Sequence, residues 1–195
     1  MLIRSKHIAT AVGMIAAAGA TWTVPGIANA SPSATSPDAT DTTGTVTVDG
    51  LWVRSAPTTS SQKRPSVDRG FEFTVRCWTP GTSVGGNDKW FAVGPDVGKW
   101  VSGNYVETDG PVARCGHGVR VRARTKGDPI LNSFSGPSIK DDSITEYQPG
   151  SRIRVRCEVS NERERDNPIW YLTTKQEWVP ASFIKLKRGT DLEIC

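Results

Sequence analysis

An enzyme would need a nucleophile, a general base or a metal site, and this sequence of 195 residues offers little for any of them. His117 is the single histidine after residue 30, so a histidine-rich metal site cannot form. A Ser/His pair stays open, although no G-x-S-x-G elbow occurs. Asp141 and Asp142 are the best carboxylate pair, and their polar loop predicts solvated side chains. We therefore expect no enzyme activity, no metal and no cofactor; catalysis would require turnover that His117→Ala abolishes.

The four cysteines follow an internal repeat. The interval from Cys77 to Cys157 equals the interval from Cys115 to Cys195. Four cysteines allow three connectivities, and the repeat favours Cys77–Cys115 with Cys157–Cys195, because both pairs then close loops of equal length. The other two pairings would cross-link the repeats. Any of the three leaves no thiolate nucleophile and indicates an oxidising compartment.

Tryptophans recur with the same repeat. Trp90 and Trp170 are separated by the same interval as the repeated cysteines, and Trp100 and Trp178 match after a small deletion. Each of these side chains could pack in the core of a small domain or lie in a binding site. Tyr105, which closes the first repeat, is a further aromatic candidate.

Trp52 and Trp78 differ from the recurring tryptophans because they alternate with inward apolar positions. Leu51 and Val53 flank Trp52, and Trp78 follows Cys77, so both indole rings are expected to point outward. Their expected counterparts in the second repeat, Arg120 and Glu158, are not aromatic. Two interpretations stand: the rings stack on a sugar or a peptide, or each covers a loop of its own domain.

Arginines alternate with apolar residues in two segments of the second repeat, namely Arg120, Arg122 and Arg124, and then Arg152, Arg154 and Arg156. Alternation predicts guanidinium groups on the outward faces of two strands. If the strands are neighbours, these groups form a stripe that can bind phosphates or carboxylates. The alternative is an ordinary solvated face balanced by nearby carboxylates, those of Glu146, Glu158, Glu162 and Glu164.

Residues 1–30 are expected to direct export. A positive start with Arg4 and Lys6 precedes an apolar segment and the small-x-small site Ala28-Asn29-Ala30, which together predict a cleaved signal peptide. The apolar segment is shorter than the ~20 residues of a membrane span. Cleavage after Ala30 removes Arg4 and Lys6 and lowers the net charge from +4 to +2, so a nucleic-acid partner is not expected.

Several short alternating segments separated by Gly, Pro and Asp predict an all-β fold without a helical period. The first repeat has alternation around Asp49-Gly50 and again in F-E-F-T-V-R-C-W, and the second has R-I-R-V-R-C-E-V. We expect a formed loop at 125–150, longer than its counterpart in the first repeat. The expected organisation is a signal peptide (1–30), a flexible linker (31–44) and two domains (45–110 and 111–195).

The first repeat resembles a bacterial SH3-like (SH3b) domain. Its segments are L-W-V-R-S-A-P-T-T-S-S, F-T-V-R-C, K-W-F-A-V and G-K-W-V-S-G-N-Y-V, against a consensus of N-V-R-S-G-P-S, V-x-V, W-x-x-V and G-W-V with a closing Y-L. The second repeat is looser: Val121 to Arg124 lack the Gly-Pro, and Pro180 replaces a serine. The resemblance implies two tandem five-stranded β-barrels used outside the cell to bind walls, peptidoglycan peptides or proteins.

These observations predict a secreted or cell-wall-associated, non-catalytic protein that binds peptidoglycan or an anionic wall polymer. The alternative is a protein-interaction module or inhibitor of a secreted protein, acting through the loop at 125–150. No membrane span is expected. The candidate ligand-binding residues are Trp52, Arg54, Trp78, Trp90, Trp100, Tyr105, Arg120, Arg122, Arg154, Arg156, Trp170 and Trp178.

Overall fold

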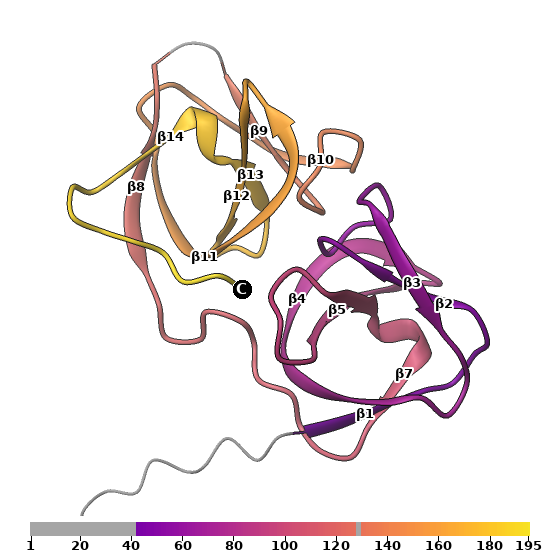
Figure 1. Ribbon diagram of the computed structural model, residues 1–195. Coiled ribbons are helices and arrows are strands. Elements are labelled where there is room, and N and C mark those ends of the chain that lie inside the picture. Colours follow the sequence, from indigo (N-terminus) through magenta and orange to yellow (C-terminus); the bar gives the residue numbers. More distant parts are fainter. Residues whose placement is uncertain (1–41, 128–129) are drawn as a thin grey trace, which may run out of the picture. The chain divides into compact units, whose positions relative to one another are not determined.

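The computed structural model describes residues 42–127 and 130–195, which form an all-β protein of two curled antiparallel sheets (Figure 1). The expected signal peptide and nearly all of the expected linker lie outside these residues. Thr42–Gly44, which the sequence assigned to the linker, are in the first strand instead. No helix in the described part is long and apolar enough to cross a membrane.

The first sheet has seven strands in the order β3-β2-β6-β5-β4-β1-β7. They are β1 (Thr42–Val46), β2 (Leu51–Arg54), β3 (Lys63–Val67), β4 (Glu72–Val84), β5 (Asn87–Val93), β6 (Trp100–Ser102) and β7 (Val106–Thr108), with a 3₁₀ turn at Gly103–Tyr105. Gly85 and Gly86 both have positive φ and close the β4–β5 hairpin, as a two-residue type I′ turn requires.

The second sheet repeats this order with β10-β9-β13-β12-β11-β8-β14. Its strands are β8 (Val121–Thr125), β9 (Leu131–Phe134), β10 (Ser143–Tyr147), β11 (Arg152–Glu164), β12 (Asn167–Thr173), β13 (Trp178–Pro180) and β14 (Ile184–Leu186), with a 3₁₀ turn at Ala181–Phe183. The repeat in the sequence is thus a repeat of the whole sheet, with seven strand segments rather than the five that the resemblance implies.

The expected loop at 125–150 is wrong, because it contains β9 and β10. By sheet order β9 is the counterpart of β2, so Leu131-Asn132-Ser133-Phe134-Ser135-Gly136-Pro137 corresponds to the segment beginning at Leu51. The second repeat therefore does have the Gly-Pro that its sequence was expected to lack. The counterpart of Trp52 is Asn132, not Arg120.

Each sheet has an apolar core built by alternation. Val46, Leu51, Val75 and Val101 are buried in the first sheet. In the second, the corresponding cluster includes Ala123, Leu131, Ile153, Val155, Val179 and Ile184. Burial of alternate residues leaves the intervening side chains on the outer faces, and this positions the site described below.

A third buried cluster contains residues of both repeats. Trp90 and Trp100 of the first lie in one cluster with Trp170 and Trp178 of the second, and each of the four is at most 2% exposed. The indole Nε1 of Trp178 donates a hydrogen bond to the carbonyl oxygen of Pro80 at 2.9 Å. The four recurring tryptophans are therefore core residues.

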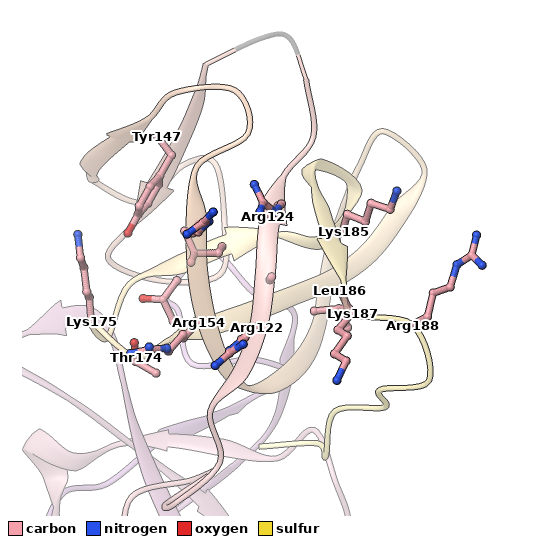
Figure 2. Close-up of a pocket in the computed structure, with 14 residues that line it drawn as sticks. Arg122, Arg124, Tyr147, Arg154, Thr174, Lys175, Lys185, Leu186, Lys187 and Arg188 are labelled. Carbon is pink, nitrogen blue, oxygen red and sulfur yellow. The ribbon is translucent and has the colours of Figure 1, made fainter.

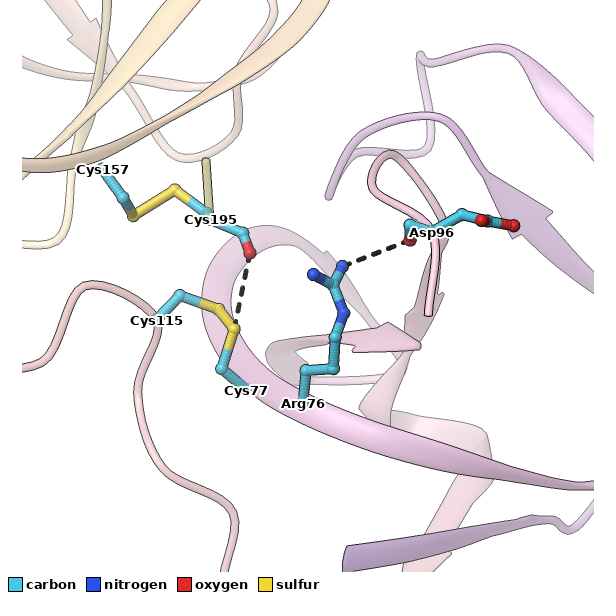
Figure 3. The surroundings of a disulfide bond; sticks show 6 residues. All are labelled: Arg76, Cys77, Asp96, Cys115, Cys157 and Cys195. Atoms are coloured by element: carbon cyan, nitrogen blue, oxygen red, sulfur yellow. Dashed lines mark hydrogen bonds between the residues drawn. A yellow bond between two sulfur atoms is a disulfide. The ribbon is translucent and has the colours of Figure 1, made fainter. Parts of the chain in front are cut away.

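The disulfides are Cys77–Cys115 and Cys157–Cys195, the pairing that the repeat favours. The Sγ of Cys77 lies 3.5 Å from the carbonyl oxygen of Cys195 (Figure 3). A disulfide sulfur has no hydrogen to donate, so this is a packing contact. Cys115 also donates its N–H to the carbonyl oxygen of Trp78. The chain is therefore still paired with the first sheet at Cys115, beyond the expected domain boundary at 110/111.

Asp141 is buried, against the prediction of a solvated side chain. Its Oδ1 accepts hydrogen bonds from the hydroxyls of Thr58 at 2.9 Å and Thr82 at 2.7 Å, both in the first repeat. Its counterpart Ser61 instead bonds within its own loop, to the carbonyl oxygens of Ala56 and Thr58. Asp141 thus links the two repeats, whereas the equivalent residue of the first repeat, Ser61, makes side-chain hydrogen bonds within its own loop.

Candidate functional site

Six cationic side chains form a regular array on the outer face of β14, β8 and β11. The register pairs Lys185 with Arg124 and Arg124 with Arg152. One step along, Arg122 pairs with Arg154, and the backbone N–H of Lys187 donates to the carbonyl oxygen of Arg122. We call Lys185–Arg124–Arg152 and Lys187–Arg122–Arg154 the two rungs of the cationic grid.

The grid faces outward because the residues between its members are inward. Ala123 and Ile153 are buried and Leu186 is half-buried, whereas all six grid residues are exposed. Two residues along a strand separate the rungs by about 6.8 Å, and neighbouring strands lie about 4.8 Å apart. The grid therefore concentrates six positive charges on a patch about one nanometre across.

The grid lines a groove of about 1010 Å³ that also includes Lys175 and Arg188. Figure 2 shows Arg122 and Arg124 on β8, with Arg154 on one side and Lys185 and Lys187 on the other. No carboxylate lines this groove, and among the described residues none of its eight cations forms an ion pair. Its remaining lining residues are Ala123, Tyr147, Ile153, Thr173, Thr174 and Leu186.

The carboxylates that the sequence offered as balancing charges do not enter the groove. Glu146, Glu158 and Glu164 are absent from its lining, and the side chain of Glu162 lies outside the described part. Burial, and secondarily the charge of Asp191, raises the pKa of Glu158. An ordinary solvated face of mixed charge therefore does not describe this surface.

The same three strands of the first sheet carry no such grid. Their equivalent rung is Glu107–Thr45–Glu72, and Thr43 pairs with Thr74 in the next. The same strand pairing is thus formed with acidic and neutral side chains at these positions. The cations of the second repeat are not required by the architecture.

One margin of the groove is fixed by a buried carboxylate. Glu177 is 7% exposed and accepts hydrogen bonds from three hydroxyls, those of Ser133 at 3.0 Å, Thr145 at 2.8 Å and Tyr147 at 2.7 Å. Burial, then the hydrogen bond and charge of Glu177, raises the pKa of Tyr147. The Nζ of Lys175 lies 5.3 Å from the centre of the Tyr147 ring. The network holds Tyr147 in place beside the cations.

A second, smaller groove lies on the first repeat. It brings together four predicted site residues, Trp52, Arg54, Trp90 and Tyr105, with Asp49. Trp52 is 44% exposed, and the Nζ of its neighbour Lys63 lies 4.7 Å from the ring centre. The outward orientation predicted for Trp52 is correct.

Arg54 is held within this smaller groove by a backbone contact. Its Nη1 donates to the carbonyl oxygen of Ser61 at 2.9 Å, and partial burial lowers the pKa of Arg54. The groove therefore combines the aromatic face of Trp52 with the positive charge of Arg54 and the negative charge of Asp49.

Trp78 does not join Trp52. Arg114 lies 4.6 Å and Lys89 5.2 Å from the centre of the Trp78 ring, and the ring packs against the core of the first sheet. Trp78 therefore covers its own domain, which was the second of the two interpretations. Trp52 and Trp78 therefore do not contribute to one shared binding surface, since only Trp52 lines the smaller groove.

Four further predictions are wrong because the side chains are buried. Trp100, Trp170 and Trp178 are at most 1% exposed, and Trp90, whose edge reaches the first-repeat groove, is 2% exposed. Their flat faces pack against protein, so none can stack on a ligand. Trp90 uses its Nε1 to bond the carbonyl oxygen of Thr82 at 2.8 Å.

The structure brings together only some of the predicted arginines. Arg122 and Arg154 are paired across β8 and β11, as the stripe required, while Arg120 and Arg156 do not line the groove. Sequence reasoning missed Lys185 of β14 and Lys187, which follows this strand. The alternation Lys185-Leu186-Lys187 is their signal, but only the pairing of β14 with β8 places it beside the arginines.

The residues considered for catalysis lie apart from both grooves. His117 is exposed in the turn after Cys115, and all four cysteines are in disulfides. Among the described residues there is no cluster of three or more His, Cys, Asp or Glu side chains that could hold a metal ion.

Comparison with known proteins gives weak likenesses. No family model matches the chain, and no curated protein matches it. Four chains of solved structures match. One is "Endolysin LysPBC5 CBD", at 12% identity over 75% of this chain and 93% of that chain, with a TM-score of 0.29. Another is NlpC2 from Trichomonas vaginalis, at 14% identity over 77% of this chain and 50% of that chain, with a TM-score of 0.27. At these scores the likenesses assign no family to the chain.

Proposed function

We propose that this is an exported, non-catalytic protein of two SH3-like domains that binds an anionic polymer of the cell envelope through the cationic grid. The observation that carries the proposal is the grid itself: two rungs of three cations with no carboxylate in the groove that they line. Export is the expectation from the signal sequence, and the two disulfides are consistent with an oxidising compartment.

Energetics support a ligand for the grid. Like charges directly opposite one another on neighbouring strands destabilise a sheet, and here Arg124 faces Arg152 while Arg122 faces Arg154. The first repeat avoids this arrangement at the equivalent positions. A bound polyanion would relieve the repulsion and would stabilise the folded state by mass action.

The smaller groove on the first repeat is proposed as an auxiliary contact. The exposed face of Trp52 can stack on a sugar ring or a peptide bond of the same envelope material, with Arg54 and Tyr105 beside it. Two weak sites in one chain raise the overall affinity when both reach the ligand together.

The test is co-sedimentation of residues 31–195 with purified cell-wall sacculi, prepared with and without their anionic polymers. We expect pelleting with intact sacculi, less pelleting after the polymers are removed, and release at high salt, which screens exposed charges. The Arg122→Gln/Arg154→Gln variant should remain in the supernatant. Arg64→Gln/Arg69→Gln, which removes two exposed arginines of the first repeat, is the matched control and should pellet normally.

Absence of pelleting in every condition would refute the envelope role. The search would then turn to an acidic secreted protein as the partner of the grid. Salt-resistant pelleting that requires Trp52 but not the arginines would assign the main site to the first repeat instead.

A further inference from the structure

We propose that the cationic grid recognises phosphodiester groups of a linear polyol-phosphate polymer, with one phosphate at each rung. This inference rests on the proposed function and specifies its ligand class. It follows from the head groups, their arrangement across three strands and the distance between the rungs.

The head groups favour phosphate. Each rung has guanidinium groups on the adjacent strands β8 and β11 and an ammonium group on β14 or just after it. A guanidinium presents a planar fork of N–H donors to two oxygens, while an ammonium acts as a compact point charge. An anion above the central arginine is therefore approached from both flanks. The two unesterified oxygens of a phosphodiester share one negative charge and can accept from donors on both flanks, while its two ester oxygens continue the chain toward the neighbouring rung.

The spacing favours a polymer of phosphates separated by short linkers. The rungs are two residues apart along β8, a distance of about 6.8 Å. Successive phosphates joined by a three-carbon polyol have a comparable reach, so neighbouring phosphates can occupy neighbouring rungs. Such a polymer would run along β8, between the side chains of β11 and β14.

The margins of the groove suit the linkers. The backbone N–H of Thr174 donates to the carbonyl oxygen of Arg154, which places the turn bearing Thr174 and Lys175 beside the second rung. Thr173, Thr174 and Tyr147 line the groove together with the cations. Polyol hydroxyls would therefore lie near polar groups of the protein as well as near charges.

The side chains at the equivalent positions of the first repeat predict how many polymer segments bind to each chain. Its equivalent rung presents Glu107 and Glu72 on either side of Thr45, which would repel a phosphate. One polymer segment should therefore bind per chain, on the second repeat.

The experiment is isothermal titration of residues 31–195 with poly(glycerol phosphate) oligomers and, in parallel, with poly-glutamate oligomers of the same number of charges. We expect the phosphate oligomer to bind at least about tenfold more tightly, the gain that one additional charge-assisted hydrogen bond can give. Arg122→Gln/Arg154→Gln should weaken phosphate binding by about tenfold or more, while Arg64→Gln/Arg69→Gln should leave it unchanged.

A third variant tests the planar donor geometry of the guanidinium groups separately from their positive charge. Arg122→Lys/Arg154→Lys keeps both charges and removes both forks, so binding of the phosphate oligomer should weaken by several fold at an unchanged salt dependence. Far-UV circular dichroism and tryptophan fluorescence verify folding of every variant.

Equal affinity for the two oligomers would overturn the inference, because the grid would then read charge alone. Tighter binding of a thymidylate oligomer of equal length would also overturn it, in favour of nucleic acid. If the phosphate oligomer fails to bind while sacculi stripped of phosphate polymers still pellet the protein, the inference fails and the envelope role stands. If the phosphate oligomer does not bind and sacculi do not pellet the protein, both this inference and the proposed envelope role are refuted.

Discussion

At the scale of single residues, Glu177 is a buried carboxylate held by three hydroxyl groups. Three hydroxyls donate to its carboxylate, and the counterparts of two of its partners in the first repeat, Val53 for Ser133 and Val67 for Tyr147, are apolar. The network therefore belongs to the second repeat alone, where it borders the cationic groove. Its loss would leave several buried hydroxyls without an acceptor.

We expect Glu177→Ala to lower the free energy of unfolding by about 3 kcal/mol, the order of the penalty for buried polar groups left without partners. Chemical denaturation measures it. Glu146→Ala, which removes an exposed carboxylate of β10, should change stability by less than about 0.5 kcal/mol. Equal effects of the two substitutions would contradict the role assigned to Glu177.

Tyr147 makes stability sensitive to alkaline pH. Its pKa is raised by burial and by Glu177, so above the ordinary tyrosine pKa of about 10 the unfolded chain loses its proton while the folded chain keeps it. The folded state then binds more protons, and stability falls as pH rises through this range. Below it both states are protonated and no dependence arises. Tyr147→Phe should flatten the decline above about pH 10, as measured by denaturation midpoints against pH. An unchanged slope would exclude Tyr147 as its source.

At the scale of elements, Asp141 shows how one loop position is used differently in the two repeats. Its carboxylate accepts hydrogen bonds from Thr58 and Thr82, whereas the hydroxyl of Ser61 bonds within its own loop. We expect Asp141→Ala to destabilise the protein by about 2 kcal/mol, since two hydroxyls lose their charged acceptor. The neighbouring exposed carboxylate provides the control, and Asp142→Ala should be nearly neutral in the same melting experiment. A neutral Asp141→Ala would mean that this contact does not hold the repeats.

Removal of grid arginines should stabilise the sheet. Arg122 and Arg154 face each other across β8 and β11, and opposed like charges cost a few tenths of a kcal/mol or about 1 kcal/mol at most. We expect Arg122→Gln/Arg154→Gln to melt above the wild type at low salt. The difference should vanish at about 1 M salt, where screening acts over about 3 Å. A variant less stable than the wild type at low salt would show that the arginines have a structural role.

Alternation along the strands was sufficient to predict the outward arginines, the outward Trp52 and the all-β class. It was not sufficient to predict the grid positions of Lys185 and Lys187, or the strands β9 and β10. Lys185 becomes part of the site only through the pairing of β14 with β8, a contact between segments that are distant in the chain. The segment from Leu131 to Pro137 was missed because the arginine-rich strand before it was aligned with the wrong strand of the first repeat.

At the scale of the whole molecule, one duplicated sheet has two different outer faces. The shared tryptophan cluster and the two disulfides explain why the recurring aromatic and cysteine residues are retained in both repeats. The outer faces of β14, β8 and β11 and of their counterparts differ at the grid, where cations replace acidic and neutral side chains. The recurring tryptophans and cysteines thus belong to the core, and the proposed binding surface has no counterpart in the first repeat. The sequence left both interpretations of the recurring tryptophans open, core packing and ligand binding, because burial depends on the packing of both repeats, which periodicity within one strand does not reveal.

The central claim is that the cationic grid is the surface that binds the envelope. The most direct test is the fraction of Arg122→Gln/Arg154→Gln that pellets with intact sacculi, compared with Arg64→Gln/Arg69→Gln at the same protein concentration and low salt. We predict that the control variant pellets like the wild type and that the grid variant stays in solution while remaining folded. Equal pelleting of the two variants would contradict the claim, because the same loss of charge would then have the same effect on either repeat.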